Sequence, residues 1–284
     1  STVYNLPPPT QGLSALMILG LFERLGVTEG EGFAHVHGLV EATKRAFRVR
    51  ERVVTDPQRL PADPKGFLKP AALTELAAEI DRKTALPWPD VAKPGDTIWM
   101  GCIDAQGRAV SFIQSVYWEF GSGVVLQDTG IVWQNRGTSF SLDPKALNVL
   151  KPGMRPFHTL NPALALFDDG RVMPYGTMGG EGQPQTQAAV FTRYARFGQG
   201  LQQAVTAPRW LLGRTWGGVT TSLKLESRFD PALVAALKAA GHEVEVFDEA
   251  FSDTMGHAGA LVRHPNGVIE GAADPRSDGV VAGV

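Results

Sequence analysis

The sequence has little of several features that mark common protein classes. It holds one cysteine, Cys102, among 284 residues, which excludes an intrachain disulfide and leaves the redox compartment open. The formal net charge is −2 without a basic run, so nothing indicates nucleic acid as a partner. The longest apolar stretch near the start, residues 13–22, is too short and interrupted to span a membrane. It also lacks the basic leader and small-residue cleavage site of a signal peptide.

Metal-ligand patterns are also missing. The six histidines are scattered, and His35 and His37 lie two residues apart without a Cys, Asp or Glu cluster around them. We therefore expect no metal and no cofactor. Cys102 lies inside an apolar run, where a small core residue is expected more often than a nucleophile.

The chain is long enough, and at 43% hydrophobic residues apolar enough, to bury a large core. Helices are expected over 13–25, 34–52, 70–82 and 231–241, the second with its arginine-bearing face in solvent. Prolines at 87, 89 and 94 keep the link 87–94 out of regular structure. Such a link suits a processing junction, although a plain interdomain linker has the same composition.

Residues 97–103 and 109–117 predict a β-hairpin, because both runs are rich in β-branched and aromatic residues. A three-residue loop, 105–107, would place Gly107 in the left-handed region and pair Asp104 with Arg108. Counting outward then sets Thr97 opposite Ser115 at the open end of the hairpin. Thr97 is either an ordinary strand residue or an N-terminal nucleophile freed by cleavage before it, with its own α-amine as base.

A glycine-rich loop, residues 176–182, precedes a helix expected to begin near Gln185. Backbone N–H groups at a helix start favour negative charge, so this loop suits an oxyanion site. A tight connection would have the same composition.

The ordered set of these motifs resembles the γ-glutamyltransferase family of N-terminal nucleophile hydrolases. The set consists of Asp96-Thr97 with the hairpin, Phe120-Gly121-Ser122-Gly123, Gly130-Ile131, Asn135, Gly176-Thr177-Met178-Gly179-Gly180 and Gly271–Ser277. The resemblance implies a four-layer αββα sandwich, an α+β fold. It makes Thr97 the nucleophile, lets Ser115 position its hydroxyl, and makes Gly179 and Gly180 the oxyanion donors. The arginines of Ala207-Pro208-Arg209 and Asp274-Pro275-Arg276 are expected to anchor loops by ion pairs.

The same resemblance divides the chain at the expected cleavage point. Residues 1–96 correspond to the end of the family's large subunit, and residues 97–284 to its catalytic small subunit, both within one domain. Family members carry a substantial stretch before the region matching Tyr4–Gly12. We therefore expect a missing N-terminal segment, or a companion chain of the same precursor, in a heterodimer of processed subunits or a higher oligomer.

The sequence departs from the family where the substrate head group binds. Ser139 stands where an acidic residue holds the α-ammonium, and His158-Thr159 stands where a serine pair binds the α-carboxylate. Tyr117 replaces an asparagine, and Asn135 and Arg136 complete the expected substrate-binding set. Without the acidic partner an ammonium is poorly held, whereas Arg136 and His158 suit a small anion. The alternative is that Arg136 and His158 are only structural.

This pattern resembles the oxamate amidohydrolase branch of the family. It implies hydrolysis of a small carboxylate-bearing amide through an acyl-threonine, after self-cleavage before Thr97. A true γ-glutamyl hydrolase or transferase, and an uncleaved non-catalytic relative, are the alternatives. A cytoplasmic location is expected, with the periplasm as the alternative.

Overall fold

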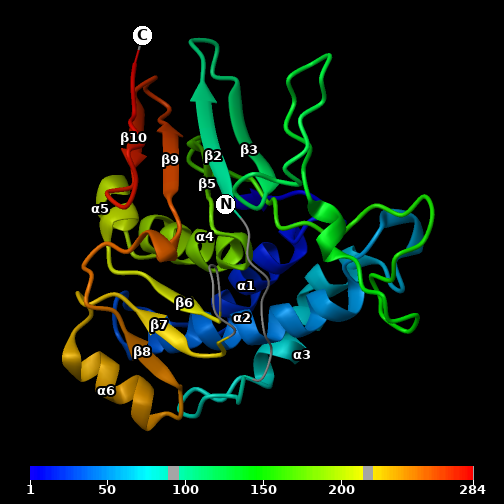
Figure 1. Ribbon diagram of the computed structural model, residues 1–284. Coiled ribbons are helices and arrows are strands. Elements are labelled where there is room, and N and C mark those ends of the chain that lie inside the picture. Colours follow the sequence, from blue (N-terminus) through cyan, green and yellow to red (C-terminus); the bar gives the residue numbers. More distant parts are fainter. Residues whose placement is uncertain (89–95, 214–219, 284) are drawn as a thin grey trace.

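The computed structural model of the chain describes residues 1–88, 96–213 and 220–283 (Figure 1). Its α-helices are α1 (Gly12–Arg24), α2 (Phe33–Val53), α3 (Pro70–Ala78), α4 (Gln183–Phe191), α5 (Leu201–Thr206) and α6 (Pro231–Ala239). Its strands are β1 (Thr2–Tyr4), β2 (Asp96–Ile103), β3 (Ala109–Tyr117), β4 (Ala163–Leu166), β5 (Val172–Thr177), β6 (Trp210–Leu212), β7 (Leu223–Leu225), β8 (Val244–Val246), β9 (Ala258–Arg263) and β10 (Ile269–Ala273). The five helices expected from the sequence, including the one beginning near Gln185, are all present.

A five-stranded antiparallel sheet, in the order β1-β4-β5-β9-β10, forms the centre of the fold. Alternate residues of β9 point to opposite faces, as the pleat of a strand requires. Ala258, Ala260 and Val262 belong to the apolar core that this sheet shares with α4 and α5. Gly259 and Leu261 lie on the other face of the sheet, where they meet the hairpin β2–β3.

The hairpin packs on the sheet through Trp99. A Cβ added at Gly176 would lie 2.1 Å from Trp99 Cδ1, and one at Gly259 would lie 2.5 Å from Trp99 Cζ3. Only glycine allows this approach, because real Cβ contacts do not reach such distances. Trp99 Nε1 also donates to Ser111 Oγ at 3.0 Å. These contacts fix the start of β2 close to the end of β5.

Below the sheet, α1, α2 and α3 pack together with the small sheet β6-β7-β8 and α6 (Figure 1). Strands β7 and β8 are parallel, and α6 makes the crossover between them. Residues on both sides of Thr97 contribute to this core, since Leu39 and Phe47 share it with Leu225 and Leu237. Among the described residues, no helix has the length and apolar character needed to cross a bilayer.

The fold class expected from the resemblance is confirmed: helices, the five-stranded sheet and the hairpin stack as successive layers of an α+β sandwich (Figure 1). The fourth layer is not found among the described residues. The even-numbered residues of β2 therefore face outward. Cys102 is exposed for this reason, and the expectation of a core cysteine is wrong.

The expectation that the arginine-bearing face of α2 lies in solvent is also wrong in part. Arg48 and Arg52 are exposed, but Arg45 and Arg50 are buried and paired with Glu41 and Glu181. Ion pairing satisfies these buried cations, which apolar surroundings alone would not. The segments 123–125 and 130–134, which extended β-rich composition would favour as strands, form one isolated bridge, Val125 to Val132.

Candidate functional site

The hairpin turn has the expected geometry. Asp104 N donates to the carbonyl of Arg108 at 3.1 Å, and Gly107 has a φ of 82°. The loop is therefore 105–107, and the register continues to the pair Ile98 and Gln114. Beyond that pair the register shifts, because Asp96 pairs with Tyr117. A β-bulge thus sets both Ser115 and Val116 against the buried Thr97, which modifies the expected one-to-one pairing.

Tyr117 adopts a backbone conformation that is rare for its residue type. Its φ is 83°, and its side chain is 2% exposed. This left-handed conformation lets its N–H donate to Ser115 Oγ at 2.8 Å. A non-glycine residue held at positive φ costs roughly 1 kcal/mol or more and is common at functional sites. The bulge and this conformation together orient Ser115 beside Thr97.

Arg136 begins the 3-10 helix Arg136–Ser139 and is 5% exposed. Its guanidinium carbon lies 4.2 Å from the centre of the Tyr117 ring, and its Nη1 donates to Thr159 Oγ1 at 3.0 Å. Its Nη2 is buried without a hydrogen-bond partner among the described residues, and no described carboxylate pairs with it. Burial lowers the pKa of Arg136 to about 10. A buried cation with an open donor is suited to bind an anion.

His158 lies next to this cation. Burial, and secondarily the charge of Arg136, lowers the pKa of His158 to about 4, so the imidazole is neutral near pH 7. Its Nδ1 is buried and lacks a partner within the described part of the chain. Its backbone N–H donates to the carbonyl of Pro9 at 3.1 Å, which fixes the segment against the start of the chain.

Asn135 and Ser139 flank Arg136 but differ in their contacts. Asn135 N–H donates to the carbonyl of Val116 at 3.1 Å, and its Oδ1 accepts from Trp118 N at 3.1 Å. Asn135 therefore ties the end of β3 to the arginine. Ser139 is partly buried, and no hydrogen bond joins it to the other predicted residues in the ranges described.

The predicted oxyanion segment lies between β5 and α4. Gly179 and Gly180 have φ values of 113° and 51°, which side chains rarely adopt. The N–H of Gly182 donates to the carbonyl of Gly179 at 2.8 Å, and α4 begins at Gln183 with Pro184 in its first turn. The glycines are thus needed for the loop itself, and they leave backbone donors at the start of a helix.

Thr97 and the residue before the glycine pair, Met178, line one groove of about 950 Å³. His257 also lines it, and its carbonyl accepts from Met178 N at 3.1 Å. The packing of Trp99 on Gly176 and Gly259 places the start of β2 beside this loop. The fold therefore brings the predicted nucleophile to a groove that Met178 of the predicted oxyanion segment also lines, whereas Gly179 and Gly180 are not among its lining residues.

Three buried side chains behind the glycine loop were not expected from the sequence. Gln11, Arg50 and Glu181 are 0%, 5% and 6% exposed and are joined by hydrogen bonds. The helical spacing of α2 could have indicated that Arg50 is buried, because Arg50 follows Phe47 by three residues and so lies on the apolar side of the helix. A charged residue at such a position needs a buried partner. Gln11 and Glu181 gave no comparable signal.

A second polar cluster lies where α2 meets the segment before β8. His37 Nδ1 and His242 Nε2 are 2.8 Å apart, and Glu41 lies within ligand distance of both, a grouping that the sequence reading missed. The two oxygens of Glu41 already accept from Lys44 at 2.7 Å and Arg45 at 2.9 Å. These cations balance the carboxylate, so the cluster does not favour a metal ion.

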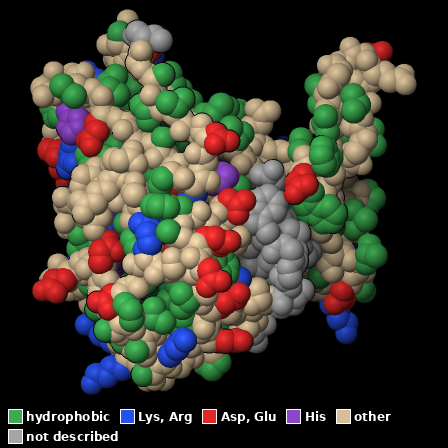
Figure 2. Space-filling model, turned by 60° about the vertical axis from the view of Figure 1, so that its left-hand side comes forward, with side chains coloured by type: hydrophobic (Ala, Val, Ile, Leu, Met, Phe, Trp, Pro, Cys, Tyr) green, Lys and Arg blue, Asp and Glu red, His purple; other side chains and the backbone are tan. Residues whose placement is uncertain are grey.

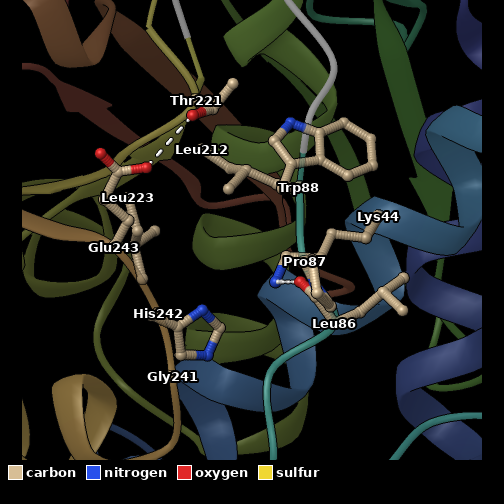
Figure 3. Close-up of a pocket in the computed structure, with 10 residues that line it drawn as sticks. All are labelled: Lys44, Leu86, Pro87, Trp88, Leu212, Thr221, Leu223, Gly241, His242 and Glu243. Carbon is tan, nitrogen blue, oxygen red and sulfur yellow. Dashed lines mark hydrogen bonds between the residues drawn. The ribbon is translucent and has the colours of Figure 1, made fainter.

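A cavity of about 350 Å³ adjoins this cluster (Figure 3). Lys44 and Trp88 line it from one side, and His242 and Glu243 from the other. The Lys44 amine points to the carbonyl of Leu86 at 2.6 Å and holds the chain there. The cluster and its cavity therefore connect α2 with the segment before β8, which lies far from α2 in the sequence.

The two expected anchor arginines are confirmed as such. Arg276 donates to both carboxylate oxygens of Glu226 at 2.5 Å and to Asp274 at 3.0 Å. Arg209 pairs with Asp274 at 2.5 Å, and all four side chains are buried. These ion pairs fasten the end of the chain to the β6 region.

Comparison with known proteins shows the family of the chain. The family model for γ-glutamyltranspeptidase matches residues 1–284. The chain belongs to the γ-glutamyltranspeptidase family. It is 60% identical over 282 residues, or 99% of its length, to the oxamate amidohydrolase proenzyme of Klebsiella pneumoniae subsp. pneumoniae, covering 53% of that protein. It is 43% identical over its whole length to the glutathione hydrolase-like YwrD proenzyme of Bacillus subtilis, covering 54% of it.

A solved structure supports the same assignment. The crystal structure of cephalosporin acylase from Bacillus halodurans superposes with a TM-score of 0.86 at 36% identity, over 99% of this chain and 50% of that one. The chain spans about half the length of the curated relatives that it matches. Proteins similar to this chain thus carry the names of an oxamate amidohydrolase, a glutathione hydrolase-like protein and a cephalosporin acylase.

Proposed function

We propose that this chain forms the catalytic part of an amidohydrolase that acts on a small amide bearing a carboxylate, such as oxamate. The observation that carries the proposal is the buried Arg136, whose Nη2 has no partner among the described residues and which no described carboxylate neutralises. A substrate carboxylate would supply the missing charge. The identity to a protein named oxamate amidohydrolase proenzyme supports this substrate class.

The proposed reaction starts with self-cleavage of the peptide bond before Thr97. The freed α-amine takes the proton of the Thr97 hydroxyl, and Oγ1 attacks the amide carbon. The N–H groups of Gly179 and Gly180 stabilise the resulting oxyanion. The C–N bond then breaks, ammonia leaves with the proton from the amine, and an acyl-threonine remains. Water hydrolyses this ester and releases the acid. Ser115, held by the N–H of Tyr117, orients the Thr97 hydroxyl.

Specificity follows from the balance of charge around Arg136. With His158 neutral and Ser139 uncharged, the guanidinium is the dominant charge of the head-group site. A carboxylate gains a charge-assisted hydrogen bond there, whereas an ammonium finds no anionic partner among these residues. Asn135 and Thr159 fix the position of the arginine through the contacts described above.

We also propose that a companion polypeptide of the same precursor covers the outer face of the hairpin, in a heterodimer of processed subunits. Ile98, Met100, Val110 and Phe112 are 45–56% exposed on that face. Hydrophobic side chains also gather on the projecting segment 118–134 (Figure 2). Large exposed apolar patches mark interaction sites, and the matched relatives are about twice as long as this chain.

The decisive test uses the full-length precursor and its Thr97→Ala variant. Wild-type protein is expected to split before Thr97, as read by intact mass, and to release ammonia from oxamate. Thr97→Ala should remain uncut and inactive, since it lacks the attacking hydroxyl of both steps, while Ser115→Ala should be slowed in both. Cleavage and full turnover by Thr97→Ala would rule out the acyl-threonine mechanism.

The second candidate function is glutathione hydrolysis, which the name of the Bacillus subtilis relative favours. The same preparation distinguishes the two. A higher kcat/KM for glutathione than for oxamate would select the γ-glutamyl reaction. An intact, inactive wild-type precursor would instead indicate a non-catalytic relative.

A further inference from the structure

The glycine loop and the Arg136 site are joined by one buried side chain, that of Gln11. Its Nε2 donates to the carbonyl of Thr159 at 2.8 Å and to the carbonyl of Gly180 at 2.8 Å. Its Oε1 accepts from Arg50 Nη1 at 2.9 Å. Because an arginine only donates and a carbonyl only accepts, the orientation of this amide is fixed. All the polar atoms of the Gln11 side chain are therefore engaged.

Arg50 and Glu181 hold Gln11 from behind. Arg50 donates to Glu181 Oε2 as well as to Gln11, and its Nε and Nη2 donate to Glu51 Oε1 at 2.8 and 2.5 Å. Its guanidinium lies 4.0 Å from the centre of the Phe47 ring. Burial alone would lower the pKa of Arg50, but the carboxylates of Glu181 and Glu51 together outweigh this effect and keep the pKa above its ordinary value. Arg50 is thus charged and has a single defined position.

This arrangement acts on the peptide groups around Gly180. The carbonyl of Gly179 accepts from Gly182 N, so in the planar trans peptide the Gly180 N–H points the opposite way. The next carbonyl, that of Gly180, is held by Gln11. Glycine has broad conformational freedom, so a loop with two adjacent glycines at positive φ keeps one geometry only when its carbonyls are fixed.

We propose that Gln11, supported by Arg50 and Glu181, is the positioning residue that sets the oxyanion loop at a fixed distance from the anion site at Arg136. Thr159 makes the link to that site, since its Oγ1 accepts from Arg136. The inference rests on the proposed function, because it assigns the Gly180 N–H to the oxyanion. Gln11 itself contacts neither substrate nor nucleophile and acts through Gly180.

The test compares wild-type full-length precursor with Gln11→Met, which keeps the length of the side chain and removes its hydrogen bonds. Glu31→Gln is the control, because it weakens another ion pair to a fully buried arginine, Arg193, outside the site. Amide hydrogen exchange over 176–184 reports on the loop without requiring activity. We expect faster exchange there in Gln11→Met and wild-type exchange in Glu31→Gln.

The kinetic measurement compares kcat and KM of the variant with those of the wild-type enzyme, using an amide that the wild-type enzyme hydrolyses. A displaced oxyanion donor should lower kcat of Gln11→Met by about 10- to 100-fold. KM should change by less than about threefold, since Arg136 keeps its own contacts. Unchanged exchange over 176–184, or loosened exchange with wild-type kcat, would overturn the proposal. A wild-type protein without any amidase activity would refute the proposed function, while the exchange data would still decide whether Gln11 fixes the loop.

Discussion

Replacing Arg136 with methionine tests the anion site most directly. Methionine keeps much of the side-chain volume and removes the charge. Burial lowers the pKa of Arg136 from its ordinary value to about 10, which corresponds to roughly 3 kcal/mol against the charged form in the folded protein. This cost is present at neutral pH and is relieved only as the pH rises above about 10, where the folded chain releases the proton before the unfolded chain does.

A bound carboxylate should recover most of that free energy. We therefore expect Arg136→Met to weaken oxamate binding by about 100-fold, equivalent to roughly 3 kcal/mol. The free energy of unfolding of the substrate-free protein should be nearly unchanged. The lost hydrogen bond to Thr159 and the lost contact with the Tyr117 ring each cost about 1 kcal/mol, and the removal of a buried unpaired charge offsets them.

The steady-state KM of the processed full-length enzyme for oxamate measures the first effect, and denaturant unfolding measures the second. Arg171→Met is the matched control, since Arg171 also lies over an aromatic ring, at 4.3 Å from the centre of Phe167, but pairs with Asp169 away from the site. It should bind oxamate as wild type does. Wild-type affinity in Arg136→Met would refute the reasoning. A loss of more than about 2 kcal/mol in unfolding free energy would make Arg136 a structural residue.

Three further predictions follow from the same geometry. Gly259→Ala should force the hairpin away from the sheet, because its Cβ would lie 2.5 Å from Trp99 Cζ3, and cost about 1–3 kcal/mol in urea unfolding, whereas Gly66→Ala, with open space around it, should not. His158 has a folded pKa of about 4 against 6.5 unfolded, so stability should fall as the pH drops from 6.5 to 4, and His158→Gln should unfold less steeply with acid over that range. Ser139→Asp should raise kcat/KM for glutathione relative to oxamate in steady-state assays, and an unchanged ratio would show that position 139 does not face the head group.

Local patterns in the sequence predicted the hairpin and its turn because both depend on nearby residues. Gly107 in a three-residue loop fixes the register, and that register holds as far as Ile98 and Gln114. The bulge beyond it was not predictable, since it depends on Tyr117 accepting a strained backbone over Arg136. The expectation that Ser115 lies opposite Thr97 was therefore correct, but the sequence did not predict that Val116 lies opposite Thr97 as well.

Contacts between distant segments account for the other differences. The amphipathic pattern of α2 placed its arginines in solvent, but Arg50 meets Glu181 across 131 residues of sequence. Gln11 likewise makes hydrogen bonds to Thr159 and Gly180, which are distant in the sequence, and no spacing of residues in the chain predicts these contacts. Cys102 was misjudged for a simpler reason, because alternation in a strand shows two faces without showing which one is covered.

The spacing of these contacts bears on substrate size. One nitrogen of Gln11 lies 2.8 Å from the carbonyl oxygens of both Thr159 and Gly180, so these oxygens are separated by at most twice that distance, about 5.6 Å. Thr159 also binds Arg136, which brings the proposed carboxylate site and the proposed oxyanion loop onto neighbouring backbone segments. In oxamate the carboxylate and the scissile carbonyl are on adjacent carbons, whereas a γ-glutamyl group places three carbons between them. We therefore expect the proposed site to favour the shorter anion, because Gln11 and Thr159 link Arg136 to the glycine loop over a short path.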